Sequence, residues 1–257
     1  MKTVATMILT ALLATGAIAS EPVDVEAIVQ KANDASYYAG KDGQATVKMS
    51  LSDGRSREFN ILRLNDKGTK NQKFYVFFAA PSDVRGMSYL VHKNPTGDDD
   101  RWLFLPALNL VKRIAPGDKR TSFVGSDFLY EDVSGRALTE DVHELVETTE
   151  KEYVVKNTPK KPDTVEFASY TVWIDKQTFL PTKAEYLDKN GKLSRRVAAT
   201  KVATVQGHPT VMESVAEDLT AGSKTVNTFL DVKYDIGLKD RIFTERFLRR
   251  PPREVTR

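Results

Sequence analysis

Residues 102–114 read WLFLPALNLVKRI, and the first four of them form a strand that is apolar on both faces. Successive side chains of a strand point to opposite faces of the sheet, so Trp102 and Phe104 share one face and Leu103 and Leu105 share the other. A sheet with one face in water needs apolar side chains only on its other face. Both faces of this strand therefore need a cover, and Pro106 ends the strand.

The segments around this strand also alternate between apolar and polar residues, with turn-forming residues between them. The predicted strands fall in residues 43–51, 57–65, 72–80, 87–93, 101–106, 144–157, 165–176, 180–192, 193–207, 208–219 and 223–237. Asn190-Gly191 and Gln206-Gly207 are predicted hairpin turns. About ten or eleven strands with short connections predict an antiparallel sheet that curls into a barrel or part of one.

The N-terminus has the pattern of a cleaved signal peptide. Residues 1–20 contain Lys2, a short apolar run and the small-x-small sequence Ala17-Ile18-Ala19. We expect cleavage near Ala19 or Ser20, export to the periplasm, and one domain over residues 21–257. Loss of Lys2 lowers the formal charge from +3 to +2, which gives no electrostatic case for nucleic acid. The chain has no cysteine for disulfides or for a lipid anchor.

Two further segments interrupt the pattern of strands. In residues 23–38, Val25, Ile28, Val29 and Ala32 follow helical spacing and predict an amphipathic N-terminal helix. Residues 115–136 are irregular, and we expect a short helix that Ser126 and Asp127 cap and that runs to Tyr130 or Glu131. Within this segment Phe123, Phe128 and Tyr130 are the predicted cover of Leu103 and Leu105.

No catalytic or metal-binding motif is recognised. His143 to Glu147 reads HELVE, in which Glu147 occupies the place of the second histidine of a zinc helix, and the surroundings predict a strand. Asp98 to Asp100 fit a solvated turn better than a calcium loop. We expect no enzyme activity and no cofactor, and a two-carboxylate hydrolase remains an alternative without positive support.

The loop residues Lys112, Arg113, Lys119 and Arg120 form a basic cluster in the sequence. One interpretation is a solvated hairpin end whose cations pair with nearby carboxylates such as Asp118, Asp127, Glu131 and Asp132. The other is a patch that docks anionic headgroups or a partner protein.

The chain resembles the outer membrane lipoprotein-sorting proteins of the LolA-like family, in its divergent periplasmic branch. The segments VRGMSYL, RWLFLPALNLVKRI, GDKRTSFVGSDFLYEDV and GLKDRIFTERFL carry the resemblance, which extends from the N-terminal helix to about Leu248. It implies a mainly β (α+β) fold, in which a strongly curved antiparallel sheet forms an incomplete barrel. The N-terminal helix and short helices would cover the concave side around an apolar cavity that receives acyl chains.

From the resemblance and the strand pattern together we expect a monomeric periplasmic carrier or chaperone for lipoprotein acyl chains or for a free lipid, in lipid transport and outer membrane biogenesis. It would dock to an inner-membrane transporter and an outer-membrane acceptor. The alternative is a non-catalytic accessory subunit of an RND-type envelope lipid transport complex, which predicts a filled interior. The candidate cavity residues are Met49, Leu51, Phe59, Ile61, Phe74, Val76, Phe78, Leu90, Trp102 and Phe104.

Overall fold

The computed structural model of the protein describes residues 24–256. The predicted signal peptide, residues 1–20, lies outside the described residues. Within residues 24–256, none of the helices has the length and apolar character needed to cross a membrane.

Thirteen antiparallel strands form one sheet. The first six are β1 (Asp42–Leu51), β2 (Ser56–Asn65), β3 (Gln72–Ala80), β4 (Ser88–Lys93), β5 (Asp100–Leu105) and β6 (Leu110–Ile114). The other seven are β7 (Asp141–Thr148), β8 (Glu152–Pro159), β9 (Phe167–Asp175), β10 (Pro181–Asp188), β11 (Leu193–Val205), β12 (His208–Asp218) and β13 (Ser223–Tyr234). The prediction of about ten or eleven strands was too low. It missed β6, and it treated β7 and β8 as one segment.

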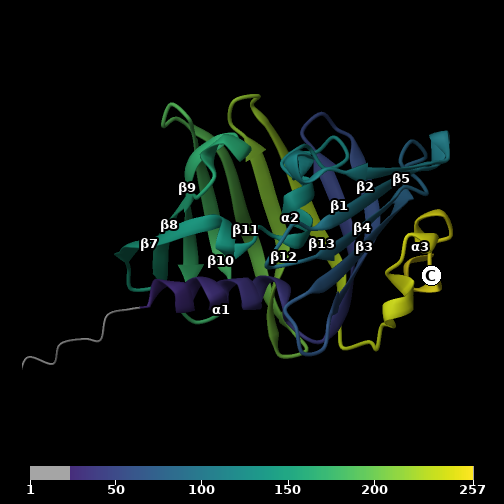
Figure 1. Ribbon diagram of the computed structural model, residues 1–257, viewed down its shortest axis with the longest axis horizontal. Helices are drawn as coiled ribbons and strands as arrows, with labels where there is room; N and C mark the ends of the chain where they lie inside the picture. The colour runs from purple at the N-terminus through teal and green to yellow at the C-terminus, as the bar shows by residue number, and fades with distance from the viewer. Residues whose placement is uncertain (1–23, 257) are drawn as a thin grey trace, which may run out of the picture.

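The strand order is β6-β5-β4-β3-β2-β1-β13-β12-β11-β10-β9-β8-β7. The first and last strands are therefore neighbours in the middle of the sheet, and β6 and β7 are its two edges. The sheet curls around a concave side and does not close into a barrel (Figure 1). This architecture confirms the predicted incomplete barrel. The connection from β6 to β7 has to pass from one edge to the other, and it crosses the concave side.

Four helices accompany the sheet: α1 (Val25–Tyr37), α2 (Tyr130–Ser134), α3 (Arg246–Arg249) and α4 (Arg253–Thr256). Single 3-10 turns occur at Pro106–Leu108, Pro116–Asp118, Leu138–Glu140, Pro162–Thr164 and Asp240–Ile242. Figure 1 shows α1 and α2 on the concave side, and α3 with the C-terminus at the other side of the sheet.

The predicted cap of α2 is wrong. The helix begins at Tyr130, and the side chain of Asp132 accepts a hydrogen bond from the Leu129 N–H at 2.7 Å. Asp127 instead accepts hydrogen bonds from the hydroxyl groups of Ser223 and Thr225, at 2.5 and 2.6 Å. Asp127 therefore fastens the segment to β13 and takes no part in capping the helix.

The predicted turn at Gln206-Gly207 is confirmed. Both residues have positive φ, 48° and 82°, between β11 and β12. Positive φ at both central residues is what a two-residue hairpin loop requires. Glycine reaches this conformation without a steric cost, and Gln206 is one of the few other residues that adopt it here.

Strands β2 to β5 carry apolar side chains on both faces. On the concave face, Val47, Phe59, Val76 and other residues of the same phase form a cluster with the connecting segment. On the convex face, Leu62, Tyr75 and Leu90 pack against the C-terminal residues Ile242, Phe243, Leu248 and Val255. The hydrogen bonds that hold this C-terminal segment in place include those from the Tyr75 hydroxyl to the Phe247 carbonyl at 2.7 Å and from the Ser88 hydroxyl to the Leu248 carbonyl at 2.6 Å.

Candidate functional site

A cavity of about 500 Å³ lies on the concave side of the sheet. Its walls come from α1, from α2 and the rest of the segment 115–140, and from strands β1 to β3 and β8 to β13. Figure 1 shows α1 and α2 over the concave side of the sheet, and residues of both helices line the cavity. The cavity is largely apolar in its lining, as ligand pockets usually are.

The wall formed by β1, β2 and β3 consists of large apolar side chains. Its strands are in register, so that Val47 lies opposite Phe59 and Ile61 lies opposite Val76. Residues opposite one another on adjacent strands point to the same face. The inward phase of these strands is therefore continuous, and its members Ala45, Val47, Phe59, Ile61, Phe74 and Val76 line the cavity.

The wall formed by β8 to β12 contains a row of smaller side chains. Val155, Val172, Ala184, Val197 and Ala199 all line the cavity from this half of the sheet. The register pairs Val155 with Val172, Val172 with Ala184, and Ala184 with Val197. Because valine and alanine reach less far from the sheet than phenylalanine, this row leaves space that the aromatic wall opposite does not fill.

Polar side chains also line the cavity on β12 and β13. Thr210, Ser214 and Asn227 lie there, and Ser214 is opposite Asn227. The side-chain oxygen of Asn227 is buried and accepts no hydrogen bond from the described residues. A buried acceptor without a partner costs stability, so this part of the cavity is less favourable for purely apolar contents.

Helix α1 covers the smaller-residue half of the sheet. Asp24 caps it by accepting hydrogen bonds from the Glu26 and Ala27 N–H groups, at 3.0 and 3.3 Å. Its buried residues Ile28, Val29 and Ala32 pack against Val155 and Ile174. The apolar stripe predicted from the sequence is thus confirmed. The helix begins two residues later than the predicted range 23–38 and ends one residue earlier.

The C-terminal end of α1 is fastened to the sheet. The guanidinium of Arg63 donates hydrogen bonds to the carbonyl oxygens of Tyr37 and Ala39, and the amide of Gln72 donates to the Tyr37 carbonyl at 2.7 Å. At the other end, His143 on β7 lies 3.0 Å from the Glu26 carboxylate. Polar contacts therefore hold both ends of α1, and small apolar side chains hold its middle.

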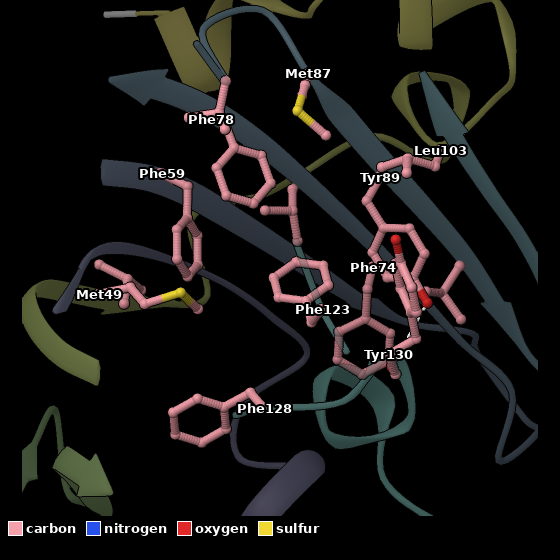
Figure 2. Close-up of a cluster of buried hydrophobic side chains, with 14 of the residues drawn as sticks. Met49, Phe59, Phe74, Phe78, Met87, Tyr89, Leu103, Phe123, Phe128 and Tyr130 are labelled. Carbon is pink, nitrogen blue, oxygen red and sulfur yellow. Dashed lines mark hydrogen bonds between the residues drawn. The ribbon is translucent and has the colours of Figure 1, made fainter. Parts of the chain in front are cut away.

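The segment 115–140 is anchored by an aromatic core. Figure 2 shows Phe123 among rings from the sheet and from its own segment. Its ring centroid lies 5.7 Å from that of Phe78 and 5.5 Å from those of Tyr89 and Tyr130. Aromatic pairs at such distances add stability beyond the area they bury. Leu103 belongs to the same cluster and Leu105 packs against it, so the predicted contact of the segment with this pair is confirmed. The contact lies on the concave face, whereas the expected place of this cover, the back of the sheet, is wrong.

Buried ion pairs anchor the same segment. The Glu131 carboxylate lies 2.9 Å from Arg120, 3.1 Å from Lys119 and 3.4 Å from Arg136. Burial by itself raises the pKa of Glu131, but the three cations outweigh burial and hold this pKa at about 2. Glu131 is therefore ionised at neutral pH, and the charges of this cavity wall are paired with one another.

Of the ten predicted cavity residues, four line the cavity: Phe59, Ile61, Phe74 and Val76. Met49, Leu51 and Phe78 have the same inward phase but lie in the packed cluster beyond the cavity lining. In Figure 2 Met49 and Phe78 are seen beside Phe59 in this cluster.

The structure places the other three, Leu90, Trp102 and Phe104, on the convex face, and their predicted position is wrong. There they pack with the C-terminal residues Phe243 and Leu248. Strands β4 and β5 are apolar on both faces, so alternation alone left their phase undetermined. Tyr89, Val91 and Leu103 occupy the concave face in their place.

The predicted basic patch is divided between two environments. Lys112 and Arg113 are exposed on β6, where Arg113 pairs with Asp100. Lys119 and Arg120 point inward and pair with Glu131, and additionally with Glu140 and Glu166 respectively. The four residues therefore do not form one docking surface. Glu140 and Glu166 lie too far along the sequence for a local pattern to reveal them as partners.

Sequence reasoning did not single out the cavity residues of β8 to β13. The sequence did contain a signal for them. The alternation predicts these strands, and their inward positions include Val155, Val172, Ile174, Val197 and Phe229. Both faces of these strands contain polar residues, so their apolar inward positions did not stand out in the sequence.

No site for a metal ion is found among residues 24–256, since no three histidine or acidic side chains of this part of the chain are suitably grouped. His143 lies on β7, as the predicted strand requires, and contacts Glu26. Asp99 pairs with Arg101 at 2.6 Å, and Asp100 pairs with Arg113.

Comparisons with known proteins agree with this geometry. A family model described as "uncharacterized protein" matches residues 70–250. A search of curated proteins finds no match. A DUF1329 family protein from Desulfovibrio piger is 29% identical, with a TM-score of 0.78, over 87% of this chain and 98% of that chain.

Two other solved structures are also similar. A protein domain from Vibrio parahaemolyticus, assigned to outer membrane lipoprotein sorting, is 27% identical, with a TM-score of 0.78, over 87% of this chain and 97% of that one. A LolA superfamily protein from Nitrosomonas europaea has the same fold at 22% identity, with a TM-score of 0.66, over 88% of this chain and all of that one. The chain thus belongs to the family of uncharacterized proteins whose model matches residues 70–250, and its similarity to these structures is consistent with a divergent member of the LolA-like group.

Proposed function

We propose that the protein is a monomeric periplasmic carrier that shields acyl chains from water in the cavity beneath α1 and α2 and delivers them toward the outer membrane. The observation that carries the proposal is the apolar cavity of about 500 Å³ between the concave sheet and its helical cover. This volume lies in the range of ligand-binding pockets, about 300 to 1,000 Å³.

Transfer of acyl chains out of water supplies the binding energy. Each methylene group that leaves water contributes about 0.8 kcal/mol. Phe59, Ile61, Phe74 and Val76 are the proposed contacts on one wall, and the valines and alanines of β8 to β11 are the proposed contacts on the other. A carrier of this kind needs no nucleophile.

The cargo in this proposal is either a lipoprotein acyl group or a free lipid such as a phospholipid or a hopanoid. The similarity to a domain assigned to outer membrane lipoprotein sorting supports the first. An inner-membrane donor and an outer-membrane acceptor would complete the path. The alternative function, an accessory subunit of an RND-type lipid transport complex, predicts a filled interior, so the cavity favours the carrier.

The test is to identify what the protein holds. The protein is purified from periplasmic extract without detergent, its bound molecules are extracted with organic solvent, and mass spectrometry identifies them. We expect acyl lipid or acylated peptide in near-equimolar amount, and a protein mass that corresponds to cleavage near residue 20. Light scattering on the same sample should give the mass of one chain.

A matched pair of substitutions on β11 serves as the control. Ala199 lines the cavity, whereas Ala203 is exposed on the same strand and does not. Ala199→Trp should lose the bound lipid, and Ala203→Trp should retain it. Absence of acyl lipid from the wild type, or equal lipid in the two variants, would count against the carrier.

A further inference from the structure

The β5–β6 hairpin exposes apolar side chains at its tip. Leu108 is 69% exposed, the highest value among the exposed large hydrophobic residues of the described chain, and Leu110 is 46% exposed. The tip has a defined shape. Pro106–Leu108 form a 3-10 turn, Asn109 follows with a left-handed φ of 46°, and Leu110 begins β6. Both leucines leave a large apolar surface exposed at this turn, so they are available for an external contact.

Cations surround this hairpin. On β6, Lys112 is exposed and follows Leu110 on the same face of the strand. On the convex side, α3 packs on β4 and β5, and Arg249 donates a hydrogen bond to the Asn109 carbonyl at 3.1 Å. The guanidinium of Arg249 also lies 5.4 Å from the centre of the Phe104 ring, which fixes α3 beside the hairpin.

The charge at this end of the molecule is positive. Residues 245–250 contain three exposed arginines, Arg246, Arg249 and Arg250, against one exposed carboxylate, Glu245. Lys112 adds a fourth cation, whereas Arg113 is paired with Asp100. This end of the chain thus has an excess of fixed cations beside exposed leucines.

We propose that the β5–β6 hairpin and α3 together form a docking surface for an anionic lipid bilayer. Leucines that enter the interface between headgroups and acyl chains, with cations at the level of the phosphates, are the combination that binds proteins to membrane surfaces. The exposed leucines of the hairpin turn lie beside an excess of cations, which suits the headgroup region of an anionic bilayer.

This docking surface is separate from the cavity. Neither Leu108 nor Leu110 lines the cavity, and binding to a lipid surface does not require cargo. Docking to empty vesicles can therefore fail while the carrier function stands, and the carrier function can fail while docking stands.

The experiment measures sedimentation of the purified protein with vesicles of phosphatidylcholine alone or of phosphatidylcholine mixed with phosphatidylglycerol. We expect binding to the anionic vesicles at low salt, weaker binding as salt rises, and little binding to the neutral vesicles. The pair Leu108→Ser and Leu110→Ser should lower the affinity about tenfold, since less apolar surface enters the interface. The pair Lys112→Gln and Arg250→Gln should lower it about 30-fold at low salt.

Matched controls change exposed aliphatic or cationic residues elsewhere on the surface. Leu230 is 58% exposed on β13 and Val202 is 46% exposed on β11, so Leu230→Ser with Val202→Ser should leave vesicle binding unchanged. Lys201→Gln with Lys224→Gln, both exposed, is the control for charge. All variants should keep the wild-type unfolding temperature, because the changed side chains are exposed.

A second readout does not depend on the substitutions above. The chain has no cysteine, so Ala107→Cys and Thr220→Cys each create one site for an environment-sensitive fluorophore. With anionic vesicles, the label at residue 107 should shift to the blue and the label at residue 220 should not.

Several results would overturn the proposal. Equal binding to neutral and anionic vesicles, unchanged binding in the hairpin variants, or a blue shift only at residue 220 would each do so. Binding to poly-glutamate without binding to any vesicle would assign the surface to an acidic protein partner. Dimerisation that the hairpin variants abolish, without vesicle binding, would assign it to a second copy of this chain.

Discussion

The two halves of the sheet are covered differently. Strands β2 to β5 have an apolar layer on each face, with the segment 115–140 inside and the C-terminal residues 240–255 outside, and β1 to β3 also form one wall of the cavity. Strands β9 to β13 have α1 and the cavity on the inside, and their convex face carries partly exposed ion pairs such as that of Arg196 with Glu185. The first half therefore supports the structure, and the second half provides the space in which a ligand can lie.

The largest expected effect is in the first half. Phe123→Ala should lower the free energy of unfolding by about 4 kcal/mol, because it removes the ring at the centre of the aromatic core. In the second half, Val172→Ala only widens an existing cavity and should cost about 1 kcal/mol. Urea unfolding of both variants measures the difference. Equal losses would remove the distinction between the two halves.

The next effect concerns the buried carboxylate. Because the pKa of Glu131 is lowered from its ordinary 4.5 to about 2, its ionised form stabilises the fold fully above about pH 4.5. The stabilisation is lost as the pH falls toward 2. Glu131→Gln should lower the free energy of unfolding by about 3 kcal/mol at pH 7, at about 1.4 kcal/mol for each unit by which the pKa is lowered.

Urea unfolding at pH 7 and at pH 3 tests the sign of this dependence. The difference between wild type and Glu131→Gln should be smaller at pH 3. The exposed residue Glu144 provides the control, since Glu144→Gln should change little at either pH. A difference that stays constant between the two pH values would contradict the proposed role of the three cations.

A smaller effect is expected where the two covers meet. Gly135, at the end of α2, has φ 76° and ψ 155°, and a Cβ there would lie 2.6 Å from the ring of Tyr37 on α1. Gly135→Ala should cost about 2 kcal/mol from backbone strain and displacement of that ring. Gly54 also has positive φ, with open space around it, so Gly54→Ala reports the strain alone. Equal unfolding temperatures for the two variants would mean that α1 and α2 are not in tight contact.

The smallest effect is expected on the convex face of β9 to β13, in contrast to the part of the convex face that the C-terminal segment covers. Arg196→Gln removes ion pairs with Glu185 and Glu217 that are about one-third exposed, and it should change stability by less than about 0.5 kcal/mol. Leu248→Ala, under the C-terminal segment, should cost about 3 kcal/mol. Thermal unfolding of both variants is sufficient. A large loss in Arg196→Gln would show that the second convex face is more than a solvated surface.

Much of this fold was predictable from alternation and turn residues. The inward phase of β1 to β3 was correct, and it is clearest in β1, whose apolar residues Ala45, Val47, Met49 and Leu51 share one face. The predicted phase is wrong at Leu90, Trp102 and Phe104. Both faces of their strands are apolar, and only the C-terminal segment decides which face points outward. The strand β6 was missed because it is short and contains Lys112 and Arg113.

The candidate site was less predictable, because it depends on contacts between distant segments. Lys119 and Arg120 look like surface residues in the sequence, and their partners Glu140 and Glu166 are brought to them only by the fold. The size of the cavity depends likewise on the apposition of the large residues of β2 and β3 and the small ones of β9 to β11. No local pattern contains that information.

Titration with an environment-sensitive fluorescent fatty acid tests the central claim most directly. We predict saturable binding by delipidated wild-type protein and by Ala203→Trp. Ala199→Trp should bind at least about tenfold more weakly, because the indole occupies the place of several methylene groups worth about 0.8 kcal/mol each. Unchanged binding by a folded Ala199→Trp variant, or no binding by the wild type, would contradict the account.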